Sequence, residues 1–182
     1  MSRKGKLIVV SGPSGVGKST VCSALLEQPE FARIVTCTTR PRRAGEEDGQ
    51  HYRFLTTEEF EARAAKGFFL EHAVVHGHHY GTPRDSVEEE LRKGKKVLLN
   101  IDVKGASQLR DKGLPLHTIF LVPPDEETLR RRLSSRGTDT IDEVSRRLVT
   151  ARAEMAERGL YDDVVMNGDL EETVRRIVEL VR

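Results

Sequence analysis

The chain has 182 residues, enough for one domain with a complete hydrophobic core. Its 30 Lys and Arg residues almost balance its 29 Asp and Glu residues, and the formal net charge of +1 excludes a global basic field for nucleic acid. The sequence contains no apolar run near the roughly 18 residues of a membrane span, and no signal-peptide pattern. We therefore expect a cytoplasmic protein, monomeric or a small homo-oligomer, that binds neither nucleic acid nor a membrane.

The first motif carries the strongest functional signal. An apolar, β-branched run at 7–10 predicts a buried strand, and 20–26 predicts the helix that follows. Between them the chain fits the phosphate-loop pattern G-x-x-x-x-G-K-[ST] at every fixed position. The residues of this loop are Gly12, Pro13, Ser14, Gly15, Val16, Gly17, Lys18 and Ser19.

The chemistry of this loop explains its residue types. The glycines let the backbone N–H groups form a ring around anionic oxygens, and the helix N-terminus adds a favourable dipole. Lys18 can reach the β- and γ-phosphates of a nucleotide, and the Ser19 hydroxyl can ligate Mg²⁺. The alternative, a glycine-rich turn without chemical importance, is disfavoured by the strand before the loop and the helix after it.

The segment after the first helix is irregular and polar. Its expected elements are a strand at 33–39, a charged loop at 40–49, an extended stretch at 51–55, a helix from the capping box Thr56-x-x-Glu59 to about 66, a hairpin with strands at 68–75 and 78–82, and a helix from Pro83 to 93. Four of the six histidines crowd the hairpin: His72, His76, His78 and His79. They suggest a metal site, but a half-exposed hairpin is preferred because no partnering cysteine or helical H-E-x-x-H pattern accompanies them.

The second half of the chain alternates strands with helices. Its expected elements are strands at 96–102, 116–122 and 163–166, and helices from 104, from Asp125, from the capping box Thr140-x-x-Glu143 to about 158, and at 170–181. Alternation of buried strands with helices predicts an α/β fold with a parallel sheet flanked by helices. The predicted division is a core at 1–35, 91–129 and 151–182, a mixed α+β insert at 36–90, and a helical lid at 130–150, which carries few apolar anchors.

The ordered set of motifs resembles guanylate kinase, a nucleoside monophosphate kinase of the phosphate-loop class, over essentially the whole chain. Beyond the phosphate loop, the motifs are Thr36-x-Thr-Thr-Arg40-x-x-Arg43-x-Gly-Glu, Gly49-x-x-Tyr52-x-Phe54, Phe69-x-Glu71, His79-Tyr80-Gly81-Thr82, Asn100-Ile-Asp102-x-x-Gly105, Arg136-Gly137-Thr138 and Asn167-x-Asp169. The resemblance implies transfer of the γ-phosphoryl group of ATP to GMP, with Mg²⁺, and binding of ATP by the phosphate loop.

The resemblance assigns the phosphate of GMP to four side chains of the insert. Arg40 and Arg43 can fork onto a phosphate with charge-assisted hydrogen bonds, and the hydroxyls of Tyr52 and Tyr80 complete the cradle. Without the resemblance, the arginines also fit a solvated loop, because acidic residues surround them.

The guanine base is assigned to Glu71, Thr36 and Thr82. Guanine presents N1–H and an exocyclic NH₂ as paired donors, which one carboxylate accepts, and the two threonine hydroxyls can bond the rest of its polar edge. Adenine lacks the N1 donor, so Glu71 would stay unpaired with AMP. The sequence alone also fits Glu71 as an edge-strand carboxylate that faces water.

The resemblance places further residues at the phosphates and at ATP. Lys18 and three lid arginines, Arg132, Arg136 and Arg147, are the expected catalytic cations, and Asn167 is expected near the adenine. The alternative for the arginines is a solvated charged helix face, and the alternative for Asn167 is a turn residue before Gly168. Asn100 departs from the family, which usually has an acidic residue there. Asp102 is expected at the acceptor site, either orienting Mg²⁺ through water or capping a helix.

Two other functions remain open at this point. One is a non-catalytic binding module on the same fold, which the intact Lys18 and Ser19 disfavour. The other is a different phosphate-loop kinase, acting on AMP or a sugar phosphate, against which Thr36, Glu71 and Thr82 argue.

Overall fold

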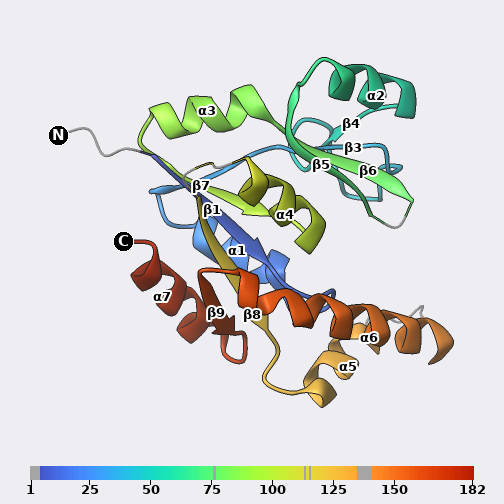
Figure 1. Cartoon of the computed structure of the whole chain (residues 1–182), viewed down its shortest axis with the longest axis vertical. Coiled ribbons are helices and arrows are strands. Elements are labelled where there is room, and N and C mark those ends of the chain that lie inside the picture. Colours follow the sequence, from blue (N-terminus) through green and yellow to red (C-terminus); the bar gives the residue numbers. More distant parts are fainter. Residues whose placement is uncertain (1–4, 76, 113, 115, 135–140) are drawn as a thin grey trace.

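The structure is a computed structural model that describes residues 5–75, 77–112, 114, 116–134 and 141–182. Its centre is a five-stranded sheet in the order β2-β7-β1-β8-β9, in which every neighbouring pair is parallel (Figure 1). The strands are β1 (Lys6–Ser11), β2 (Phe31–Arg33), β7 (Lys96–Asn100), β8 (Leu116–Val122) and β9 (Asp163–Met166). The predicted α/β fold with a parallel sheet is therefore confirmed.

Both faces of this sheet are covered by helices, as a parallel sheet requires. Alternate residues of β1 enter two separate cores: Ile8 and Val10 pack against α1 (Lys18–Leu26) and α7 (Leu170–Leu180), while Leu7 and Val9 pack on the other side. On that side lie α3 (Arg84–Arg92) and α4 (Val103–Asp111), which contribute Val87 and Leu109. The period of two in β1 thus anchors a three-layer sandwich.

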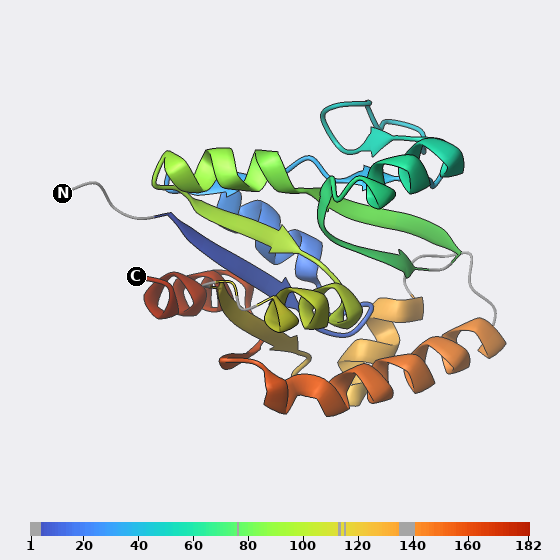
Figure 2. The same ribbon diagram turned by 45° about the horizontal axis from the view of Figure 1, so that its top comes forward.

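A second, four-stranded sheet lies beside the first, in the order β4-β3-β6-β5 (Figures 1 and 2). Its elements are β3 (Cys37–Thr38), β4 (Arg53–Phe54), α2 (Thr57–Ala65), β5 (Phe69–Val75) and β6 (His78–Pro83). Phe60 of α2 stacks on Phe69 of β5 with ring centroids 4.3 Å apart, and this pair forms a small core with Cys37. The predicted capping box is present, because Thr56 and Glu59 exchange side-chain and backbone hydrogen bonds.

Two helices lie across from the second sheet, beyond the carboxyl ends of the main strands (Figure 2). They are α5 (Glu126–Ser134) and α6 (Ile141–Ala156), and a 3₁₀ turn (Glu157–Leu160) leads from α6 to β9. Leu129 and Leu133 of α5 pack against Leu148 and Ala151 of α6. In the part of the chain that the structure describes, no helix has the length and apolar composition to cross a membrane.

The sequence was wrong about one strand and about one strand end. The strand predicted at 33–39 is two strands, β2 and β3, which belong to different sheets, so 34–36 connects the main sheet to the second one. The strand predicted at 96–102 stops at Asn100, and Asp102 caps α4 instead. The predicted capping residue Thr140 lies outside the described residues. The division into core, insert and lid stays a prediction.

Candidate active site

The phosphate loop joins β1 to α1 in a conformation that needs glycine. Gly12, Gly15 and Gly17 have φ angles of 142°, 83° and 100°, a region that other L-residues rarely adopt. A Cβ on Gly12 would lie 2.5 Å from the Leu121 carbonyl oxygen. The Lys18 ammonium donates to the carbonyl oxygens of Gly12 at 2.6 Å and Pro13 at 3.0 Å, so it lies over the loop.

The underside of the loop is held at one carbonyl group. Asn167, 6% exposed, donates its amide to the Val16 carbonyl oxygen at 2.7 Å. Arg132 donates to the same oxygen at 3.0 Å and to the Asn167 carbonyl oxygen at 3.1 Å. A Cβ on Gly17 would lie 2.6 Å from the Asn167 amide nitrogen, so that glycine also makes room for this support. Asn167 and Arg132 therefore hold the loop in shape.

The tip of the loop is held from α6. The backbone N–H of Ser14 donates to Oε2 of Glu154 at 3.1 Å. The Ser14 hydroxyl accepts a hydrogen bond from the Arg147 guanidinium at 3.3 Å. One loop residue thus contacts two side chains of the same helix.

A buried carboxylate faces the loop from the second sheet. Glu71 is 4% exposed, which excludes an edge-strand carboxylate in water, and its Oε1 accepts a 2.5 Å hydrogen bond from the Thr82 hydroxyl. Burial raises the pKa of Glu71 to about 7, although the hydrogen bond from Thr82 opposes the shift. A Cβ on Gly105 of α4 would lie 2.7 Å from Oε2, so the glycine leaves space for the carboxylate.

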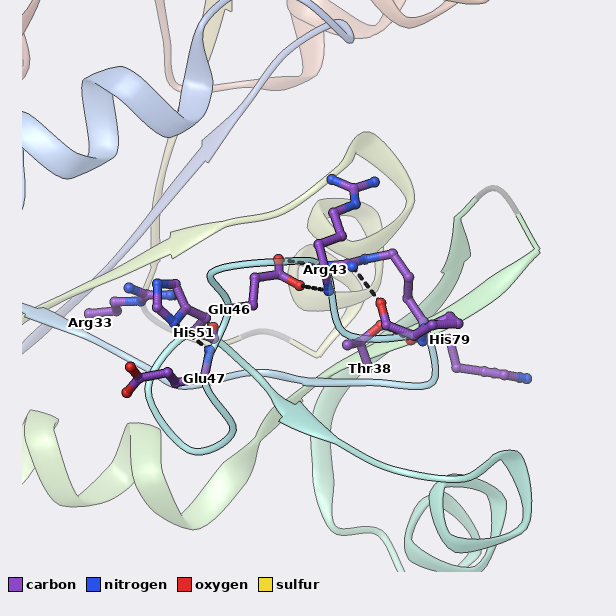
Figure 3. A network of polar contacts seen from close by, with 9 residues as sticks. Arg33, Thr38, Arg43, Glu46, Glu47, His51 and His79 are labelled. Carbon is purple, nitrogen blue, oxygen red and sulfur yellow. Dashed lines mark hydrogen bonds and ion pairs between the residues drawn. The ribbon is translucent and has the colours of Figure 1, made fainter. Parts of the chain in front are cut away.

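The loop between β3 and β4 presents the arginines of the insert. Arg40 is 8% exposed and donates to the Pro41 carbonyl oxygen and to Glu46, each at 2.7 Å, with its guanidinium 5.5 Å from the ring centre of Tyr52. Figure 3 shows Glu46 turned toward Arg43, whose backbone N–H donates to the second carboxylate oxygen at 2.8 Å. The side-chain hydrogen bond from Arg40 is the main reason that the pKa of Glu46 falls to about 2.

A cavity of about 500 Å³ joins the two sides of the site. It is lined by Ser14, Lys18, Ser19, Thr36, Tyr52, Glu71, Ala73, Val74, Val75, Tyr80, Gly81, Asn100, Ile101, Asp102, Lys104, Thr150 and Glu154. Phosphate-loop residues therefore share one cavity with the buried carboxylate, two tyrosine side chains and α6. Such a cavity can hold two small anionic ligands end to end, with cations at one end and an acceptor for paired donors at the other.

The end of β7 lies between these two sides. The Asn100 amide donates to the Ser19 hydroxyl at 3.3 Å. Asp102 lines the cavity and accepts from the Gly105 N–H at 2.9 Å, which makes it the N-cap of α4. Of the two roles predicted for Asp102, the structure therefore contains the helix cap.

A family model described as guanylate kinase matches residues 4–182 of this chain. The guanylate kinase of Symbiobacterium thermophilum is 47% identical over 179 residues, covering 98% of this chain and 85% of the relative. The guanylate kinase of Synechocystis is 45% identical over 181 residues, covering 99% of this chain and 95% of the relative.

The chain belongs to the guanylate kinase family. Among solved structures, the guanylate kinase from Anaplasma phagocytophilum superposes with a TM-score of 0.83 at 36% identity, covering 99% of this chain and 86% of that one. A shikimate kinase from Bacteroides thetaiotaomicron superposes with a TM-score of 0.52 at 16% identity, which shows a shared fold alone.

Within this guanylate kinase fold, the predicted site residues take different places. Thr36, Tyr52, Glu71, Tyr80 and Asp102 line the cavity with the loop. Among the predicted GMP-binding residues, all of which the structure describes, Arg40, Arg43 and Thr82 do not line the cavity. Thr82 nevertheless donates a hydrogen bond to Glu71, which does. Arg136 lies outside the described residues.

The roles of three residues at the site were not predicted from the sequence. Gly105 belongs to a motif of the resemblance, but only the structure shows that it makes room for Glu71. Glu46 ends the motif that begins at Thr36 and was also taken as part of the acidic surroundings of Arg43, but its hydrogen bonds with Arg40 and Arg43 were not predicted. Glu154 had one available signal: it follows Arg147 by seven residues, two helical turns, on the same helix face.

Proposed function

We propose that the protein transfers the γ-phosphoryl group of ATP to GMP, giving ADP and GDP. Membership of the guanylate kinase family supports this activity. The observation that carries the assignment to this site is the shared cavity, in which Lys18 and Ser19 lie across from the buried Glu71. A phosphate oxygen of GMP attacks the γ-phosphorus, and the bond from that phosphorus to the ADP oxygen breaks.

Glu71 is the proposed reader of the base. As a carboxylate, it accepts from N1–H and the exocyclic NH₂ of guanine, and Thr82 keeps one of its oxygens oriented. Thr36 lines the same cavity and supplies a further hydroxyl. With AMP the carboxylate would be buried without paired donors, and such a loss can reject an analogue by a factor on the order of 10⁴.

The phosphate of GMP is assigned to Arg40, Arg43, Tyr52 and Tyr80. Tyr52 and Tyr80 lie with ring centres 6.1 Å apart at 71°, so their rings are fixed edge to face at the cavity wall. Glu46 accepts a 2.7 Å hydrogen bond from the Arg40 guanidinium. An incoming phosphate offers the same guanidinium a bidentate partner, which is the geometry that arginine favours.

The transferred group is assigned to Lys18, Arg132, Arg136 and Arg147. Phosphoryl transfer depends on alignment and on charge stabilisation rather than on a covalent nucleophile. Lys18 and Arg147 both contact the phosphate loop, and Arg132 supports it from below. ATP binding is assigned to residues 12–19, and Asn167 is proposed to act there through the Val16 carbonyl.

Mg²⁺ is the proposed cofactor, and the residues present fit it. Mg²⁺ is commonly held by one or two protein oxygens together with substrate phosphates and waters. Among the described residues no cluster of three or more His, Cys, Asp or Glu side chains forms a separate metal site, and the Ser19 hydroxyl lies in the cavity beside the Asn100 amide. A bound Mg²⁺ neutralises charge on the β- and γ-phosphates. A cytoplasmic location and a monomeric or small homo-oligomeric state stay predictions.

One coupled assay tests the function. ATP and Mg²⁺ are supplied with GMP, dGMP, AMP or a ribose phosphate, and diphosphate formation is followed. We expect GDP from GMP and at least a thousandfold lower kcat/KM with AMP. Folded protein that makes no GDP refutes the proposal, and equal use of AMP refutes the role of Glu71.

A further inference from the structure

The contact between α6 and the phosphate loop is a two-point attachment. Ser14 gives its backbone N–H to Glu154 at 3.1 Å and accepts at its hydroxyl from Arg147 at 3.3 Å. Glu154 and Arg147 are seven residues apart on one helix, so both project from the same face. Because the two hydrogen bonds reach Ser14 from points two helical turns apart, together they restrict both rotation of α6 about its axis and sliding of α6 along the loop.

The apolar contacts of α6 do not fix this register. Leu148 and Ala151 pack against α5 through Leu129 and Leu133, and this cluster contains no polar group. Apolar packing holds the helix on the protein but is non-directional. The polar contacts at Ser14 therefore decide where the side chains of α6 stand at the mouth of the loop.

We propose that Glu154 is a positioning residue for phosphoryl transfer: it anchors α6 to the loop tip and thereby sets the place of the Arg147 guanidinium. This inference rests on the function proposed above and names a residue beyond the predicted site. Glu154 itself touches neither the reacting phosphorus nor the base in this account. Its acceptor oxygen takes a single N–H of the loop, that of Ser14.

The charge of Glu154 is the feature that needs explaining. A carboxylate in a cavity built for phosphates repels them, so a site optimised only for affinity would have no acid at this position. A hydrogen bond between a backbone N–H and a carboxylate is stronger than one to a neutral acceptor. The placement is understandable if the anchor is worth more to transfer than the repulsion costs in nucleotide binding.

The rival interpretation is that Glu154 competes with nucleotide phosphate for the Ser14 N–H. In that case ATP would have to displace the carboxylate, and removing the carboxylate would tighten ATP binding. Both interpretations allow tighter ATP binding in Glu154→Ala, so kcat separates them: it falls if Glu154 anchors α6 and does not fall if Glu154 only competes with phosphate.

The experiment compares three single variants with the parent protein. Glu154→Ala removes the acceptor, Glu154→Gln keeps a neutral acceptor oxygen in the same place, and Glu126→Ala is the matched control. Glu126 is an exposed carboxylate that pairs with Arg152 of α6, so its loss removes a polar contact of the same helix that is remote from the loop. Measurements are kcat, KM for each substrate, the dissociation constant of ATP, and hydrogen exchange of the Ser14 amide by NMR.

We expect Glu154→Ala to lower kcat by about tenfold to a hundredfold, the range of one lost charge-assisted hydrogen bond. KM for GMP should stay within about twofold, and the Ser14 amide should exchange faster. Glu154→Gln should recover kcat to within about fivefold of the parent, since it restores the acceptor. Glu126→Ala should match the parent in every measurement.

A double-variant cycle tests the route through Arg147. If Glu154 acts by placing that guanidinium, Glu154→Ala should cost little further in kcat once Arg147→Ala is present. Full additivity overturns the proposal, as does a kcat of Glu154→Ala equal to that of the parent. Equal loss in Glu154→Gln and Glu154→Ala overturns it as well, because charge rather than anchoring would then matter. Exchange at Ser14 needs no turnover, so it stays informative if the parent makes no GDP.

Discussion

The Thr82 hydroxyl and the Glu71 carboxylate form a buried 2.5 Å hydrogen bond between neighbouring strands of the second sheet. Thr82 is fully buried and Glu71 is 4% exposed, so water cannot replace either partner. The donor opposes a pKa rise that burial causes and that Asp102 reinforces, and the pKa of Glu71 stands at about 7. A carboxyl group with that pKa changes its charge near neutral pH, where the proposed reaction is to be measured.

We predict that GMP binding strengthens with rising pH through 7. Only the carboxylate form of Glu71 accepts both guanine donors, and it becomes the majority form above its pKa of about 7. For one required deprotonation, KM for GMP should fall about tenfold between pH 6 and pH 8. Steady-state kinetics with saturating ATP across this range measure the effect.

Glu71→Gln is the control for this profile. The phosphate of GMP titrates near pH 6 and adds its own pH dependence, which the variant retains. We expect a higher KM for GMP in the variant, a flatter profile above pH 6.5, and an unchanged KM for ATP. A parent profile that is as flat as that of the variant would contradict the role of Glu71.

The same group predicts the pH dependence of stability. The folded-state pKa is raised above the ordinary value of 4.5, so the folded protein binds more protons between these values. The contribution of Glu71 is therefore fully present below about 4.5 and is lost as pH rises through 7. Relative to Glu71→Gln, the parent should lose up to about 3 kcal/mol of unfolding free energy between pH 4.5 and pH 8. Denaturant unfolding at several pH values measures this loss. A difference in unfolding free energy between parent and variant that does not change with pH would show that burial does not shift the pKa of Glu71.

Gly105→Ala should impair GMP use specifically. The added Cβ would stand 2.7 Å from Oε2 of Glu71, which forces the carboxylate from its place. Alanine suits the interior of α4, so the helix itself gains rather than loses stability. We expect KM for GMP to rise about tenfold or more, equivalent to 1.4 kcal/mol or more, with KM for ATP unchanged. Gly159→Ala, where no atom lies within 4 Å of the added Cβ, is the control. Equal kinetics of both variants would refute the steric argument.

The sequence predicted the site better than the connection between its halves. The phosphate loop was predicted from its residue types and spacing, whereas Glu71 was predicted only through the resemblance to guanylate kinase, because the sequence alone also fitted a carboxylate that faces water. The break at 34–36 was missed because five of the six residues at 34–39 are β-branched, and local preference cannot tell one strand from two that belong to different sheets. The support of Val16 by Asn167 and Arg132 was also beyond reach, since those contacts join residues more than 100 positions apart.

Lys18→Ala should abolish transfer and leave the fold intact. The ammonium donates to the carbonyl oxygens of Gly12 and Pro13 in its own loop, and Lys18 is not a member of the hydrophobic core cluster formed with α1. Removing a cation from the transferred phosphoryl group costs roughly 3–4 kcal/mol or more in the barrier. We expect kcat to fall at least about a hundredfold, with the unfolding transition within a few degrees of the parent. Retention of kcat within about tenfold would exclude the assigned role.

The last prediction concerns movement of the second sheet toward α6. Transfer requires exclusion of water, while the cavity of about 500 Å³ has both substrate sides in one open space. The second sheet is attached to α4 by a pair of hydrogen bonds between Gln108 and the backbone of His72, at 2.6 and 3.1 Å. These bonds can act as a pivot for a sheet that connects to the main one through 34–36. We therefore predict closure when GMP and a non-hydrolysable ATP analogue bind together, and only partial closure with either alone.

Distance labels on engineered cysteines measure this closure. Glu61→Cys in α2 and Val149→Cys in α6 are exposed sites on opposite sides of the cavity, and Val149 is 65% exposed. The native Cys22 and Cys37 are buried, and burial raises the pKa of both thiols, so they should resist labelling. The control pair is Glu27→Cys, at the C-cap of α1, with Glu171→Cys in α7, because these two helices pack in one core cluster. We expect the first distance to shorten with both ligands and the second to stay constant. An unchanged first distance would mean that the site is preformed, and Arg40, which does not line the cavity, would then have to reach GMP without that movement.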